Sequence, residues 1–315
     1  MDLVQDILRG ERRSVARAIS LVEGQKPSAP QLLTALYPHT GRAHLIGVTG
    51  SPGTGKSTLV NQLALAFRRQ EKQVGIIAVD PSSPFSGGAL LGDRIRMRDL
   101  AGDPGIFMRS MATRGAMGGL SAATFDAVQV LDAAGYDVIL IETVGVGQDE
   151  VEIARTAHTV IVIQVPGLGD DIQAIKAGLM EIADLFVVNK ADREGADQAA
   201  RTLEMMIELD GPRAQEWQIP VCKTVALDGT GVSDLIFCIQ KHHSYLLDSG
   251  MLQDKERQRT QTWLHRALQQ TLLMQFLERL ESDALQTMLD RIVARKVAPY
   301  AALRELLDGV QASGQ

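Results

Sequence analysis

The segment from residue 50 to residue 57 constrains the fold more than any other stretch of the chain, because it reads Gly-Ser-Pro-Gly-Thr-Gly-Lys-Ser. It matches G-x-x-x-x-G-K-[ST], a phosphate-binding loop that needs a strand before it and a helix after it. An apolar run at 45–48 precedes it, and residues 58–69 carry apolar side chains at helical spacing. Lys56 would reach the β- and γ-phosphates, and the Ser57 hydroxyl would ligate Mg²⁺. The predicted nucleotide contacts here are Gly50, Ser51, Pro52, Gly53, Thr54, Gly55, Lys56, Ser57 and Thr58.

From His44 onward, apolar runs alternate with helical patterns, which predicts an α/β fold of the P-loop NTPase class. We expect a mostly parallel sheet with helices on both faces, since the runs are almost continuously Val, Ile and Leu. In such sheets ligands bind at the carboxyl ends of the strands. The expected strands are 44–49, 74–79, 105–109, 137–142, 159–164, 185–189 and 219–224.

Three carboxylates near the ends of these strands are candidate metal ligands beside Ser57. Asp80 ends the second strand, Asp93 follows after a Gly/Ser/Pro-rich segment, and Glu142 ends the fourth strand. A cation held on phosphates prefers oxygen ligands, directly or through water. Asp80 could instead be a turn residue and Asp93 a helix cap. Glu142 could hold the metal's water shell or the attacking water.

Two loops are candidates for sensing the nucleotide. The segment after Glu142 contains Gln148, which could orient the attacking water or could be an exposed loop amide. With Lys56 and Glu142, Gln148 completes the predicted catalytic set. The loop after the fifth strand, at 165–176, carries Gly, Pro and an Asp pair, so it is either a capped helix start or a further switch. Its candidate switch residues are Asp170, Asp171 and Lys176.

The sixth strand ends in Asn189-Lys190-Ala191-Asp192, a pattern that indicates guanine. The Asp192 carboxylate would accept hydrogen bonds from guanine N1 and the exocyclic amine, and adenine does not offer that arrangement. The predicted base contacts are Asn189, Lys190 and Asp192. After the seventh strand, a backbone N–H in the segment Val225-Ala226-Leu227 would contact the guanine oxygen.

The ends of the chain carry helical patterns, which predicts three regions: an N-terminal helical extension at 1–43, a GTPase domain at 44–250 and a C-terminal helical arm at 251–315. The arm is so apolar that it must be buried, either on its own GTPase domain or on a second copy. A net charge of -6 gives no basic footprint for nucleic acid. Cys222 and Cys238 lack metal-ligand spacing and are expected to be buried thiols. With no signal-peptide pattern and no 18-residue apolar run, we expect a cytoplasmic protein without a membrane segment.

Together and in this order, the phosphate loop, the segments 79–84 and 92–97, the segment 142–148 and the Asn189–Asp192 motif closely resemble the MeaB/ArgK family of GTPases. The resemblance implies a homodimeric, metallochaperone-class GTPase that uses Mg²⁺ and GTP. Its implied partner is the adenosylcobalamin-dependent methylmalonyl-CoA mutase or a relative, whose cofactor loading the family gates and which it protects or reactivates. It also implies that Asp80, Asp93 and Glu142 surround Mg²⁺ and that 165–176 is the third switch. Val225 departs from the serine that is common in the family.

Two other functions remain open on the sequence. GTPases that insert nickel into hydrogenase or urease share this nucleotide site but carry Cys/His metal motifs, and this chain has no Cys-Pro-His. A stand-alone regulatory GTPase without a cofactor client is the other alternative. A kinase acting on periplasmic binding proteins, an older name in this family, has no support in the residues.

Overall fold

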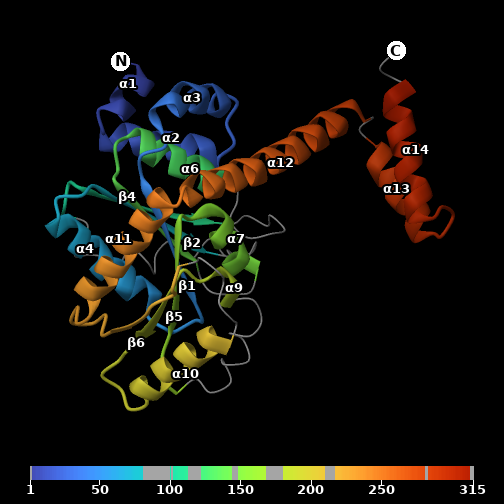
Figure 1. The fold of residues 1–315 in the computed structure, drawn as a ribbon. Coiled ribbons are helices and arrows are strands. Elements are labelled where there is room, and N and C mark those ends of the chain that lie inside the picture. Colours follow the sequence, from blue (N-terminus) through green and yellow to red (C-terminus); the bar gives the residue numbers. More distant parts are fainter. Residues whose placement is uncertain are drawn as a thin grey trace. The chain divides into compact units, whose positions relative to one another are not determined.

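The computed structural model describes residues 2–80, 100, 102–112, 122–143, 148–167, 180–209, 217–280 and 283–312. The chain forms two compact units, Met1–Arg259 and Thr260–Gln315. The first unit contains the sheet and most of the helices (Figure 1).

Seven strands form one sheet in the order β3-β2-β4-β1-β5-β6-β7, and every pairing between neighbours is parallel. The predicted α/β fold is therefore confirmed, and the predicted strand ends are shifted by no more than three residues. Because β1 lies at the centre, the loop that follows it stands at the middle of the carboxyl edge. The strands are β1 (His44–Gly50), β2 (Val74–Asp80), β3 (Ile106–Ala112), β4 (Val138–Thr143), β5 (Thr159–Gln164), β6 (Leu185–Asn189) and β7 (Val221–Thr224).

Helices cover both faces of the sheet, because alternate residues of each strand enter two separate apolar clusters. One face packs against α4 (Lys56–Arg69) and α11 (Val232–Asp248). The other face packs against α1 (Leu3–Leu8), α2 (Arg12–Glu23), α3 (Ala29–Leu36), α6 (Ala122–Ala133), α7 (Gln148–Thr156) and α10 (Ala196–Leu209). The short η1 (Tyr37–His39) and α9 (Met180–Ile182) also belong to this unit.

Helix α7 approaches β1 closely at Gly47. A Cβ there would lie 2.6 Å from Cγ1 of Ile153, so only glycine leaves room for the helix. The two cysteines are free thiols. Burial, followed by the neighbouring Cys238, raises the pKa of the Cys222 thiol to about 12.

At the amino edge of the sheet, the first turns of α12 (Met251–Arg279) are bonded to the residues just before β5 and β6. Lys255 Nζ donates to Oδ2 of Asp184 at 2.9 Å and to the carbonyl oxygen of His158 at 2.7 Å. His158 Nε2 lies 2.5 Å from Oε1 of Glu256, and its Nδ1 accepts the N–H of Leu45 at 3.2 Å. Because Nδ1 is an acceptor, the proton of the neutral ring lies on Nε2 and is donated to Glu256.

A chain of three hydrogen-bonding side chains continues this network. Thr159 Oγ1 lies 2.8 Å from Nε2 of His44 and 2.8 Å from Nδ1 of His242. Burial lowers the pKa of His44 well below its usual value, and burial also lowers the pKa of His158. Burial would raise the pKa of Glu256, but the His158 and Arg259 contacts outweigh it and hold that pKa at about 2. The edge therefore combines neutral histidines with an ionised carboxylate.

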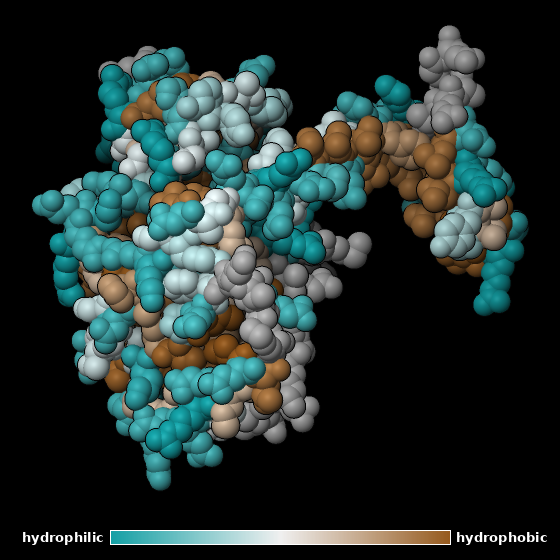
Figure 2. Space-filling view, in the orientation of Figure 1, coloured by the Kyte–Doolittle hydropathy of each residue, from teal (hydrophilic) through white to brown (hydrophobic). Residues whose placement is uncertain are grey.

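The second unit contains the rest of α12, α13 (Ala284–Val293) and α14 (Pro299–Ala312). An ion pair between Arg291 and Glu305 joins α13 to α14 at 2.6 Å. Apolar residues gather over this unit in Figure 2, and many are exposed. The exposed apolar residues of 260–312 include Leu264, Leu268, Leu272, Leu273, Met274, Leu277, Leu285, Leu289, Val293, Tyr300, Leu303 and Leu307. None of the helices within the described ranges has both the length and the apolarity required to cross a bilayer.

Candidate nucleotide-binding site

The phosphate loop joins β1 to α4 and depends on glycine at two close approaches. Gly50 has a φ of 143°, and a Cβ there would lie 2.3 Å from the carbonyl oxygen of Ile163 on β5. Gly55 has a φ of 91°, and a Cβ there would lie 2.5 Å from Nδ2 of Asn189. Larger residues would push the loop away from two strand ends, so these glycines allow the loop to sit against the sheet edge.

Lys56 is buried at the first position of α4. Its Nζ donates to the carbonyl oxygens of Gly50 at 2.7 Å and Ser51 at 3.0 Å. The ammonium is thus held inside the curve of the loop. A helix N-terminus and a lysine together provide positive potential for bound phosphate.

Ser57 and Glu142 meet across the sheet edge. The Ser57 hydroxyl donates to Oε1 of Glu142 at 2.5 Å, and the glutamate is 8% exposed. A hydroxyl oxygen and a carboxylate oxygen that lie side by side are the hard oxygen ligands that Mg²⁺ prefers, so the chemistry of these residues fits the predicted metal. Asp80 is the last residue of β2, and the preceding pair Val79↔Thr143 brings its backbone to the same edge.

The motif that follows β6 is bonded directly to the phosphate loop. Asn189 Nδ2 donates to the carbonyl oxygen of Thr54 at 2.8 Å. Lys190 has a φ of 57°, and its Nζ donates to the carbonyl oxygen of Gly53 at 2.8 Å. The carboxylate of Asp192 is left at the exposed side of the motif. Two of the four motif residues therefore brace the phosphate loop from the side.

The loop after β7 is bonded to the same asparagine. Asn189 Oδ1 accepts from the N–H of Ala226 at 3.0 Å and from Oγ1 of Thr224 at 3.1 Å. Val225 pairs with Thr230, which closes the loop, and Leu227 stands 84% exposed at its tip. One amide side chain thus connects three loops at the carboxyl edge. Sequence reasoning missed Thr224, whose only signal was its position before the expected guanine loop.

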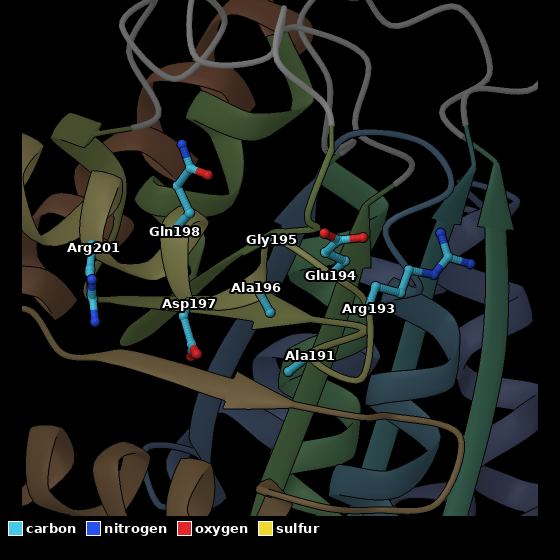
Figure 3. A pocket seen from close by; sticks show the side chains of 8 residues that line it. All are labelled: Ala191, Arg193, Glu194, Gly195, Ala196, Asp197, Gln198 and Arg201. Carbon is cyan, nitrogen blue, oxygen red and sulfur yellow. The ribbon is translucent and has the colours of Figure 1, made fainter.

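A polar cavity of about 600 Å³ begins inside the guanine motif and extends along the start of α10 (Figure 3). Two arginines and two carboxylates line it, so its formal charges balance. It lies directly beside the loop that carries Asp192. Its lining residues are Ala191, Arg193, Glu194, Gly195, Ala196, Asp197, Gln198 and Arg201.

The remaining predicted site residues are not brought into this geometry by the described part of the chain. Gln148 is the first residue of α7, and only its backbone is described. Asp93, Asp170, Asp171 and Lys176 lie outside the described residues. Their predicted metal and switch roles stay predictions.

Comparisons with known proteins agree with this geometry. The family model described as "Methylmalonyl Co-A mutase-associated GTPase MeaB" matches residues 15–281. GTPase ArgK of Escherichia coli is 37% identical over 317 residues, covering 98% of this chain and 96% of that protein. The mouse protein named methylmalonic aciduria type A homolog, mitochondrial, is 32% identical over 294 residues. The match covers 87% of this chain and 70% of that protein.

Among solved structures, the crystal structure of a protein named LAO/AO transport system kinase superposes with a TM-score of 0.73. It is 31% identical, and the match covers 98% of this chain and 96% of that one. These matches cover most of the chain, and the matched region includes the phosphate loop and the guanine motif, which are hydrogen-bonded to each other. This protein therefore belongs to the MeaB/ArgK family and is a P-loop GTPase.

Proposed function

We propose that this GTPase is a chaperone for an adenosylcobalamin-dependent acyl-CoA mutase, with methylmalonyl-CoA mutase as the first candidate. In this role it gates cofactor loading and protects or reactivates the mutase in the cytoplasm. The family description and the mouse relative's name support the choice of client. The observation that carries the GTPase part is the Asn189 side chain, which ties the guanine motif, the phosphate loop and the loop after β7 together.

Guanine specificity would come from Asp192. Its exposed carboxylate can accept from guanine N1–H and the exocyclic amine, while adenine would leave it unpaired. Asn189 and Lys190 are held by the phosphate loop, so the motif is positioned before the base arrives. Backbone N–H groups of the Val225–Leu227 segment would complete the base site.

The phosphate end would use the chain's own charges. Lys56 would exchange its carbonyl partners for the β- and γ-phosphate oxygens and neutralise charge that develops there. Ser57 and Glu142 would hold Mg²⁺, with Asp80 and Asp93 acting directly or through water. When bound, Mg²⁺ supplies further neutralisation of the phosphates. Gln148 is the candidate for orienting the attacking water.

The active form in this proposal is a homodimer formed through the second unit. An exposed apolar set of this size is unusual on a monomer and marks an interaction surface. A second copy presents the same set, which gives a self-complementary interface.

Mutase capture is the direct test of the client. The tagged full-length chain is incubated with candidate acyl-CoA mutases in GDP or in a non-hydrolysable GTP analogue. We expect retention of a cobalamin-dependent mutase to differ between the two nucleotides. Asp192→Asn is the control, because weakened nucleotide binding should abolish that difference. A mutase that is retained with neither nucleotide contradicts the proposed client.

The third switch has its own test. Asp170→Ala, Asp171→Ala or Lys176→Ala should leave intrinsic GTP hydrolysis nearly unchanged and reduce its stimulation by the mutase. If the Asp pair only caps a helix, about 1 kcal/mol of stability is lost and stimulation remains. Asp2→Ala is the matched control, since Asp2 caps α1 by accepting from the N–H of Val4. Full stimulation in all three variants excludes the switch role.

A further inference from the structure

Two threonine hydroxyls face one another directly beneath the nucleotide site. Thr143 Oγ1 donates to Oγ1 of Thr49 at 2.9 Å, and both residues are fully buried. The neighbouring register pair Val48↔Glu142 places the two threonines opposite each other at the ends of β1 and β4. Thr49 immediately precedes Gly50 of the phosphate loop, and Thr143 immediately follows Glu142.

The hydroxyl pair and the metal-side carboxylate lie on opposite faces of the sheet. Leu140 belongs to the cluster under α4, and Ile141 belongs to the cluster on the other face. By alternation, Glu142 points to the α4 face, where it accepts from Ser57, and Thr143 points to the face that α7 covers. The end of β4 is therefore bonded to the phosphate-loop segment on both of its faces.

Packing alone does not require these hydroxyls. Valine has nearly the same shape as threonine and suits a buried strand at least as well. A pair of apolar groups of the same shape in place of two bonded polar groups is close to neutral for stability. What the hydroxyl pair adds is a directional connection between the strand that carries Glu142 and the strand that begins the phosphate loop.

We propose that Thr49 and Thr143 are positioning residues for the metal, because their bond holds Glu142 where its carboxylate meets Ser57. This inference rests on the proposed Mg²⁺ and GTP site and specifies what fixes its geometry. Loss of a group that is hydrogen-bonded directly to a metal ligand typically weakens metal affinity about 10–100-fold, and the Thr49–Thr143 bond acts one residue away from Glu142, so we expect an effect at the low end of that range. Guanine recognition, which depends on Asn189 and Asp192, lies outside this connection.

A double-mutant cycle separates positioning from packing. Thr49→Val and Thr143→Val each leave one buried hydroxyl unpaired, so each should lower the urea midpoint. The variant carrying both changes should regain most of the stability. All three should nevertheless need about tenfold more Mg²⁺ to slow the release of a fluorescent GDP analogue. Release in EDTA should match that of the unmutated protein.

Thr159→Val is the matched control, because Thr159 is another fully buried threonine but lies at the amino edge of β5. It should change the urea midpoint and leave the Mg²⁺ midpoint where it was. An unshifted Mg²⁺ midpoint in Thr49→Val/Thr143→Val overturns the proposal. If that variant does not fold, Thr143→Ser is compared with Thr143→Ala, because only serine keeps the hydroxyl group. Equal Mg²⁺ midpoints in these two variants would overturn the proposal. GDP release that ignores Mg²⁺ in the unmutated protein instead refutes the proposed metal site, and this inference with it.

Discussion

The side-chain nitrogen Nδ2 of Asn189 lies 2.8 Å from the carbonyl oxygen of Thr54, so the guanine motif and the phosphate loop are hydrogen-bonded to each other. This bond joins the start of the guanine motif to the middle of the phosphate loop. Because Oδ1 of the same residue accepts from Thr224 and Ala226, Asn189 organises three loops with one side chain.

Base recognition can be separated from loop organisation by two variants. Asp192→Asn should weaken GTP binding by about 2 kcal/mol, the scale of hydrogen bonds to a charged acceptor, and leave the melting temperature of the nucleotide-free protein unchanged. Asn189→Ala should weaken binding and also lower that temperature, since it leaves buried partners unpaired. Calorimetry and melting curves measure both. Equal affinities for ATP and GTP in the unmutated protein would contradict the assignment.

Hydrolysis should depend on Lys56 and Glu142 in different ways. Lys56→Ala removes phosphate neutralisation and should slow hydrolysis by two or more orders of magnitude. Glu142→Gln keeps the size of the side chain, so GDP should still bind while hydrolysis and the use of Mg²⁺ are impaired. Single-turnover assays across a Mg²⁺ titration check this. Normal hydrolysis by Glu142→Gln at limiting Mg²⁺ would show that the carboxylate is not a ligand.

The histidine network predicts that stability decreases on acidification. Burial lowers the pKa values of His44 and His158 in the folded protein, whereas unfolded histidine titrates near 6.5. Above pH 6.5 both states are neutral and these groups contribute no pH dependence. Below it the unfolded chain binds more protons, so the free energy of unfolding should decrease by up to about 1.4 kcal/mol per pH unit for each histidine.

Urea unfolding at pH 7.5, 6.5 and 5.5 measures this slope. His44→Gln should make it shallower, because one buried neutral imidazole is removed. His39→Gln, at an exposed position on the surface, is the control and should leave the slope as it is. A flat profile in the unmutated protein over this range would refute the role of the network.

The exposed apolar residues of the second unit predict a dimer, and charged substitutions among them should prevent it from forming. Leu268 and Leu272 lie one helical turn apart on α12 and are 49% and 61% exposed. Leu268→Glu/Leu272→Glu should give a monomer by light scattering. The free energy needed to bury two unpaired carboxylates exceeds what the apolar contact contributes to association. Leu247→Glu, equally exposed on α11, is the control and should leave the mass unchanged. A monomeric unmutated protein would exclude the homodimer.

The sequence allowed the sheet and the nucleotide loops to be predicted because their signals are local. Strands β5 and β6 each contain an unbroken run of four apolar residues, 160–163 and 185–188, and the phosphate loop and Asn189–Asp192 are contiguous motifs. The order of the strands needed the structure, since parallel pairing joins residues far apart in the chain. His44 and Val138 are register partners across 94 positions.

Side-chain pairs across strands were beyond sequence reasoning for the same reason. Thr49 falls at the end of one expected strand and Thr143 just after another, and their hydroxyl contact exists only once β1 and β4 are side by side. His158 and Glu256 likewise lie 98 positions apart. Nothing in the sequence indicates that these two polar residues pair, and their hydrogen bond is seen only in the folded structure.

The hydrogen bonds from α12 to the amino edge of the sheet limit where this GTPase can be truncated. A fragment that stops at Gly250 would remove Lys255 and Glu256, the partners of Asp184 and His158. The Asp184 side chain is only 18% exposed, so it would be left as a half-buried carboxylate without its lysine partner. A fragment that continues through Arg259 keeps these bonds. A fragment designed to keep the amino edge of the sheet intact therefore has to include the first nine residues of the long helix, 251–259.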